Sequence, residues 1–126
     1  MLDLTVAIPA GAYRIPESRL SAALRAQWPH TVVVRATGRV ATYNTGQWQV
    51  FPEVGAPVLA LLRLHTAGDA VDIEVADRHV AAQLVSMLTC LPGFPSSGEA
   101  LLFEWAPSGP AALTAAMSPE EVLALR

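Results

Sequence analysis

Three histidines and one cysteine carry the side chains best suited to proton transfer or nucleophilic attack near neutral pH. They are His30, His65, His79 and Cys90. His79 and Cys90 share one side of a predicted helix, but eleven residues at a rise of about 1.5 Å separate them by roughly 16 Å. Because a nucleophile and its base must approach to about 3 Å, this helix excludes a Cys/His dyad. We expect the row that these two form with Gln83 and Ser86 to be a solvated or partner-facing edge.

One histidine belongs to a cluster of polar residues. Arg63, His65, Asp72 and Glu74 alternate with apolar residues along two predicted strands, so the four share one face of a sheet. A His65–Asp72 pair suits a general base with its orienting carboxylate or, with further ligands, part of a metal site. The same pattern stabilises a solvated hairpin without any chemistry. We assign the four residues to partner binding, and we assign no catalytic residue, metal ligand or cofactor.

Sequence motifs for common enzymes are missing. The eight glycines form neither GxGxxG nor a P-loop, the chain has no lysine, and neither HExxH nor GxSxG occurs. The single cysteine excludes an internal disulfide and any two-cysteine metal or redox motif. These absences favour a protein that acts by binding.

Composition points to one domain that spans residues 1–126. Hydrophobic residues make up 52% of the chain and charged residues 15%, which favours a buried interface or self-association into a homodimer. Six arginines lie between positions 14 and 63, but the net charge is −3 and no nucleic-acid motif occurs, so we do not expect nucleic acid as the partner. Arginine in place of lysine is typical of a GC-rich bacterial genome. No apolar run approaches the ~20 residues of a membrane span, and a cytoplasmic location is expected.

The polar cluster lies on a predicted hairpin. Gly68 and Asp69 suit a two-residue type II′ turn, because glycine stands at the first central position. Charged residues then oppose charged residues, and aliphatic residues oppose aliphatic ones, which specifies the register. This register pairs Thr66 with Val71, His65 with Asp72, Leu64 with Ile73, Arg63 with Glu74 and Leu62 with Val75.

The segment that precedes this hairpin predicts a strand, a helix, a strand and another hairpin. Alternation over Leu2 to Ile8 indicates a half-buried strand, and Pro16 can begin a helix. Three successive valines in Thr31 to Ala36 indicate a central strand covered on both faces. The second hairpin is expected from Arg39 to Tyr43 and Gln47 to Phe51, with Trp48 opposite either Tyr43 or Thr42.

The segment that follows predicts two helices and a strand. Asp77 can cap a helix whose apolar stripe is Val80, Leu84, Met87, Leu88 and Leu91. Ala100 to Trp105 indicates a strand, and Pro107 to Pro110 a loop. Ser118 and Glu121 have the spacing of a capping box before a short closing helix. Of the tryptophans, Trp28 is expected in the core, and Trp48 and Trp105 in the core or an interface.

The elements together predict an α+β fold: a mostly antiparallel sheet of about six or seven strands, with two main helices on one face and a short C-terminal helix. Our functional hypothesis is a non-catalytic bacterial protein that binds another protein, with an immunity or antidote role by occlusion as the best guess. The alternative is a small enzyme or ligand-binding domain that uses the His65–Asp72 pair in a pocket between sheet and helices.

Overall fold

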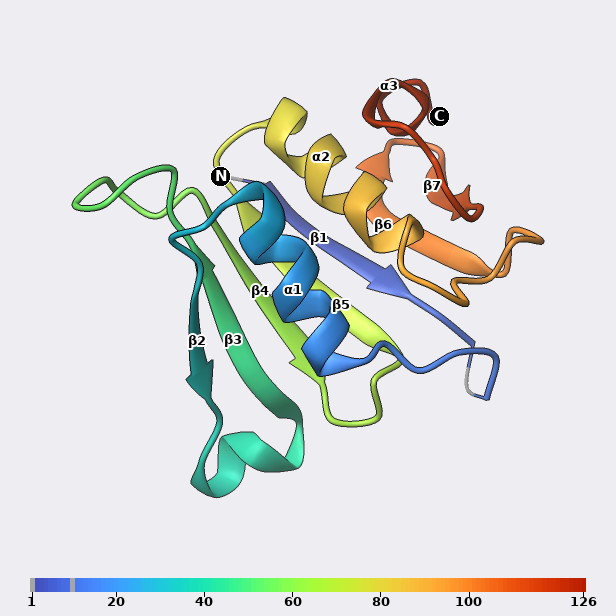
Figure 1. Ribbon diagram of the computed structural model, residues 1–126. Coiled ribbons are helices and arrows are strands. Elements are labelled where there is room, and N and C mark those ends of the chain that lie inside the picture. The colour runs from blue at the N-terminus through green and yellow to red at the C-terminus, as the bar shows by residue number, and fades with distance from the viewer. Residues whose placement is uncertain (1, 10) are drawn as a thin grey trace.

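In the computed structural model the chain forms one seven-stranded antiparallel sheet whose helices pack on one face (Figure 1). The structure describes residues 2–9 and 11–126. The strand order is β2-β3-β4-β5-β1-β6-β7, so the first strand lies between the fifth and the sixth. The predicted α+β architecture is confirmed. The elements are β1 (Leu2–Ala7), α1 (Glu17–Gln27), β2 (Val32–Arg35), the 3₁₀ helix η1 (Gly38–Thr42), β3 (Asn44–Val50), β4 (Ala60–His65), β5 (Ala70–Val75), α2 (Arg78–Thr89), β6 (Ala100–Ala106), β7 (Gly109–Leu113) and α3 (Pro119–Leu123).

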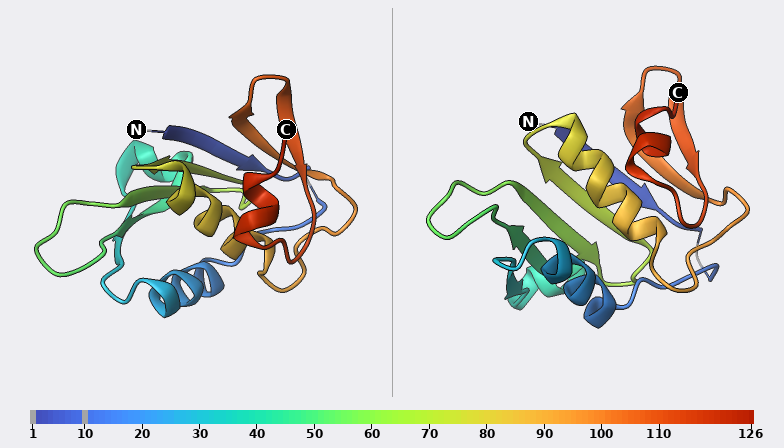
Figure 2. Two further views of the ribbon diagram at one scale, coloured as in Figure 1. Left: turned by 90° about the horizontal axis from the view of Figure 1, so that it is seen from above. Right: turned by 45° about the horizontal axis from the view of Figure 1, so that its top comes forward.

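The hydrophobic core lies between the sheet and the helices. Figure 2 shows α1, α2 and α3 on the same side of the sheet. Alternate residues of each central strand point into this layer, as the pleat of a strand requires. Trp48 is fully buried there, and its indole Nε1–H donates a hydrogen bond of 2.8 Å to Oγ of Ser21 on α1. Large core side chains include Val6, Leu20, Leu24, Val50, Leu62, Leu64, Ile73, Leu84, Leu88, Leu102 and Leu113.

Local sequence signals place the two C-terminal helices correctly. The Asp77 carboxylate accepts a hydrogen bond from the backbone N–H of Val80, which confirms the predicted cap of α2. Ser118 and Glu121 form the predicted capping box, in which each side chain accepts from the other residue's backbone N–H. Both caps satisfy backbone groups that a helix leaves unpaired at its start.

The β4–β5 hairpin keeps the predicted faces but not the predicted register. Leu62 lies opposite Ile73 and Arg63 opposite Asp72, two residues away from the expected pairs. The connection is the four-residue segment 66–69, so the predicted two-residue turn is wrong. A shift of two residues leaves every side chain on its original face, because side chains alternate with a period of two.

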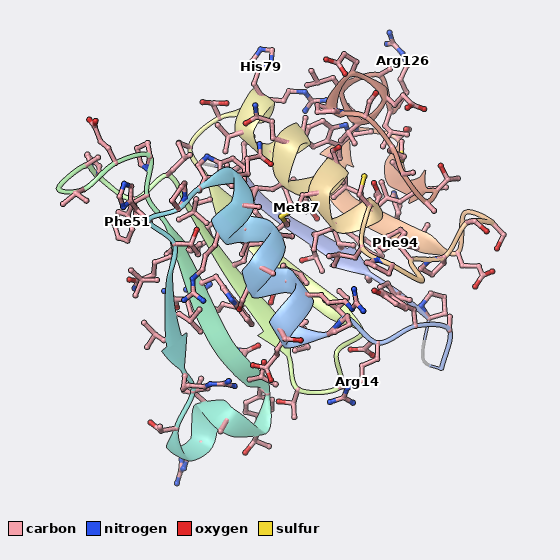
Figure 3. The ribbon with its side chains drawn as sticks, in the orientation of Figure 1. Arg14, Phe51, His79, Met87, Phe94 and Arg126 are labelled. Atoms are coloured by element: carbon pink, nitrogen blue, oxygen red, sulfur yellow. The ribbon has the colours of Figure 1, made fainter. Side chains whose placement is uncertain are left out.

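Contacts from an earlier part of the chain account for this turn. Arg14, which lies beside it in Figure 3, donates hydrogen bonds to the carbonyls of Thr66 and Ala67 at 3.1 and 3.2 Å. The Gly68 carbonyl accepts from the backbone N–H of Ile15 at 2.9 Å. Gly68 has φ +72°, a conformation that glycine adopts without a steric penalty. Within the hairpin itself the N–H of Gly68 donates to the His65 carbonyl at 2.8 Å, but the groups of Arg14 and Ile15 that hold the turn lie outside it.

Two predictions about the first half of the sheet are wrong. The segment predicted as a central strand forms the edge strand β2, in which Val33 faces the core while Val32 and Val34 are 45% and 47% exposed. The expected hairpin from Arg39 to Tyr43 and Gln47 to Phe51 does not form, since η1 replaces its first strand. β3 pairs instead with β2 and β4, so Trp48 lies opposite Val33 and Leu62. Three valines fit an edge as well as a centre, and local pattern does not decide strand order.

The C-terminal end of the sheet contains a strand that the sequence patterns missed. Ala100 to Trp105 is confirmed as a strand and extends to Ala106, but the predicted loop from Pro107 to Pro110 overlaps the start of β7. Pro110 lies on this edge strand, where a missing N–H does not interrupt the ladder. Within the described residues, the helices are all too short or too polar to cross a membrane.

Substituting Gly68 tests the origin of the turn. A Cβ at position 68 would lie 2.5 Å from Cγ of Arg14, whereas a Cβ at Gly55, with φ +81°, meets nothing within 4 Å. Gly55→Ala should therefore cost only the conformational penalty of about 1 kcal/mol. Gly68→Ala should cost about 1 kcal/mol more, because Arg14 must give up its hydrogen bonds. Urea unfolding of both variants measures this difference, and equal losses would contradict the role of Arg14.

Candidate functional site

The four predicted polar residues lie together on the face of the sheet opposite the helices. Arg63 and His65 come from β4, and Asp72 and Glu74 from the neighbouring β5. Their side chains are between 35% and 41% exposed. The residues between them point into the core, so the alternation that builds the core also presents the polar cluster.

The predicted partners meet although they are not directly opposite one another. Nε2 of His65 lies 2.9 Å from Oδ2 of Asp72, and an ionised carboxylate accepts this hydrogen bond from the imidazole N–H. Nη1 of Arg63 lies 3.6 Å from Oε1 of Glu74. Both contacts are diagonal, because the two-residue shift places Arg63 opposite Asp72. The register prediction is wrong, yet the side-chain pairs form.

The first strand adds two polar residues that sequence reasoning did not include. Thr5 donates a hydrogen bond of 2.8 Å from Oγ1 to Oδ1 of Asp72. Asp3 lies opposite Glu74 in the β1–β5 ladder. Both residues occupy polar positions of the alternating first strand, so the sequence pattern predicts that they face away from the core. The pattern does not predict that β1 lies beside β5, because strand order depends on distant parts of the chain.

The open face, as we call the sheet surface opposite the helices, is acidic at this cluster. Asp3, Asp72 and Glu74 supply three carboxylates against the single guanidinium of Arg63, which leaves two net negative charges while His65 is neutral. Half-buried apolar side chains flank the charges: Leu61 lies opposite Glu74, and Phe103 lies opposite Thr5. Of these neighbours Phe103 is the one whose residue type is enriched at protein interfaces, together with Arg63.

The His65–Asp72 pair has the orientation of a general base but an open setting. Arg63 contributes to a hollow of about 240 Å³ that also includes Val34, Val40 and Gln47, and this hollow is not lined by His65. Among residues 2–9 and 11–126, no group of three His, Cys, Asp or Glu side chains is arranged to hold a metal ion. The geometry suits contact with a flat partner better than enclosure of a small substrate.

The polar row on α2 is only partly solvated. His79, Gln83 and Cys90 are exposed, but Ser86 is buried and donates a hydrogen bond of 2.7 Å to the Met117 carbonyl. The expectation that Ser86 belongs to a solvated edge is therefore wrong, because the segment before α3 covers it. Gln83 and Cys90 line a groove of about 540 Å³ between α1 and α2, on the side of the sheet away from the polar cluster.

The two tryptophans that lie on strands, Trp48 and Trp105, are core residues. Trp48 is fully buried and Trp105 is 4% exposed, whereas Trp28 is only partly buried at the end of α1. The guanidinium carbon of Arg78 lies 3.8 Å from the centre of the Trp105 ring, which is cation–π geometry. Neither strand tryptophan is available as an exposed contact residue.

The chain matches no protein-family model, no curated protein and no solved structure.

A double-mutant cycle at His65 and Asp72 measures how strongly the cluster is coupled. Because both side chains are about 40% exposed, we expect a coupling free energy below about 1 kcal/mol. Arg63 and Glu74, at 3.6 Å, should be coupled less strongly. The measurement is urea unfolding of the single and double alanine variants. A coupling of several kcal/mol would show a desolvated pair and contradict the open setting.

Proposed function

We propose that this protein is a non-catalytic bacterial protein-binding domain of the immunity or antidote type, which occludes its partner with the open face of its sheet. The observation that carries the proposal is the gathering of Arg63, His65, Asp72 and Glu74 on the face that α1, α2 and α3 leave uncovered. Their partial exposure leaves hydrogen-bonding capacity for a partner.

The charge of the open face defines the chemistry of the partner. Three carboxylates against one guanidinium attract a basic surface, and such complementarity speeds association and sets orientation. Leu61 and Phe103 supply apolar area beside the charges. The partner that fits is therefore a protein with a basic patch next to exposed apolar side chains.

Occlusion needs a broad complementary surface and no reaction chemistry. A sheet face holds its side chains on a rigid scaffold, which lowers the entropy lost on binding. A partner that binds nucleic acid or another polyanion through a basic surface would lose access to it once this acidic face is docked. The lone exposed Cys90 fits a reducing compartment, so the proposal places the protein in the cytoplasm.

The rival function, a small enzyme with His65 as base and Asp72 as its orienter, has one supporting observation, the 2.9 Å contact between them. Its second requirement is an enclosed substrate site beside the imidazole. The side chain of His65 is instead 40% exposed on the open face. This setting favours binding over turnover.

Capture from the native host followed by charge reversal tests the proposal. The full chain is used to isolate its partner, which mass spectrometry identifies, and the affinity is then measured by calorimetry. Glu74→Lys should weaken binding about 10-fold or more, because it converts attraction to repulsion at the centre of the acidic face. Arg63→Glu should act in the opposite direction, and added salt should weaken the wild-type complex.

Glu120→Lys on α3 is the matched control. It makes the same charge change at an exposed position on the helical side, so the affinity should change less than about twofold. Thermal unfolding of each variant confirms that the fold is retained. Equal affinities of wild type, Glu74→Lys and Arg63→Glu would refute the assignment of the open face.

A further inference from the structure

Most of the large exposed apolar side chains in the described part of the chain lie along one edge of the sheet. Val32 and Val34 are on β2, and Val40 follows its C-terminal end in η1 at 57% exposure. Tyr43, 71% exposed, lies beyond η1, and its carbonyl accepts from Thr66 at the end of β4. Val54, 82% exposed, lines a hollow with Val32 near the N-terminal end. This concentration marks an interaction surface.

The edge strand also has unused backbone hydrogen-bonding groups. β2 pairs with β3 alone and is the outermost strand in Figure 1. The N–H of Ala36 donates to the Thr45 carbonyl, so alternate residues Val34 and Val32 also direct their backbone groups toward β3. Val33 and Arg35 therefore direct theirs outward. The strand carries no proline, lysine or bulge that would block pairing with another strand.

We propose that two copies of this chain associate by antiparallel pairing of β2 with β2, about a two-fold axis at Val33. The backbone N–H and C=O of Val33 point away from β3. Val33 of each copy can therefore exchange two N–H···O=C bonds with Val33 of the partner subunit. Val32 lies opposite Val34 of the partner subunit on the same face. The pairing is self-complementary, as a two-fold interface requires.

Charge supports a second copy as the occupant. The hollow at the N-terminal end of β2 includes Glu53, and Arg39 lies beyond the C-terminal end in η1. Arg35, at that end of the strand, is already paired with Glu17 of α1 at 2.7 Å, so among the described residues Arg39 supplies the free positive charge there. Antiparallel pairing brings the acidic end of each copy to the basic end of its partner. A parallel arrangement would set like charges together. The same two-fold brings Val54 toward Val40 of the partner subunit, so the exposed apolar residues at both ends gain neighbours.

The dimer leaves the polar cluster available. Pairing at β2 extends the sheet sideways, so the open faces of both copies form one continuous surface with two acidic clusters. The proposal does not depend on the protein-binding function, since it uses the edge of the sheet and that function uses its face. The strand that pairs with β2 is the β2 strand of a second copy. A strand of a different protein is the alternative, and sedimentation of the pure chain distinguishes the two.

Sedimentation velocity over a concentration series tests the dimer and its register. Wild type should be a reversible dimer. Val32→Lys with Val34→Lys should raise the dimer dissociation constant about 10-fold or more, because the introduced lysines face each other across the axis. Val32→Lys with Val34→Glu should keep the dimer, since unlike charges then face each other. If the two-fold axis lay at Val34 instead, the two introduced glutamates would oppose each other, and this variant would lose the dimer.

Ala112→Lys is the matched control, because Ala112 is exposed on β7 at the opposite edge. It should leave the dissociation constant unchanged within about twofold. Circular dichroism and thermal unfolding confirm that each variant folds. A wild-type monomer at millimolar concentration, a dimer that withstands the double lysine variant, or a dimer that Ala112→Lys disrupts would each overturn the proposal.

Discussion

The pairing of β1 on both of its sides is the constraint on which the sheet depends. β1 joins the four-stranded unit β2–β5 to the β6–β7 hairpin, because it pairs with β5 on one side and β6 on the other. Leu4 and Val6 then complete the core under the helices, while Thr5 reaches Asp72 on the opposite face. One strand thus closes the core and completes the polar cluster at the same time.

Local signals in the sequence were sufficient for faces and caps. The alternation of Arg63 and His65 with Leu62 and Leu64 specifies which side of a strand is buried, and this holds whatever the register. The Asp77 cap is also local, since donor and acceptor are three residues apart. These features depend on neighbours in the chain, so a sequence pattern contains all of their determinants.

Strand order and register required information from distant segments. Arg14 binds the β4–β5 turn from more than fifty residues away, and no pattern within the hairpin indicates it. The three valines of β2 predicted a covered strand, but their hydrophobicity serves an edge equally well. The candidate site was found incompletely for the same reason. Its four central residues follow from one hairpin, whereas Asp3 and Thr5 join it only through the position of β1.

The position of β1 also has a consequence for biosynthesis. Vectorial synthesis makes β1 before the other strands of this sheet, and Asp72, the partner of Thr5, lies 67 residues further along the chain. Leu4 and Val6 therefore remain without their sheet neighbours until β5 has left the ribosome, and the second side of β1 waits for β6. Ribosome-associated chaperones would meet this apolar strand before its partners in the sheet exist, so β1 needs protection until β5 and β6 have emerged.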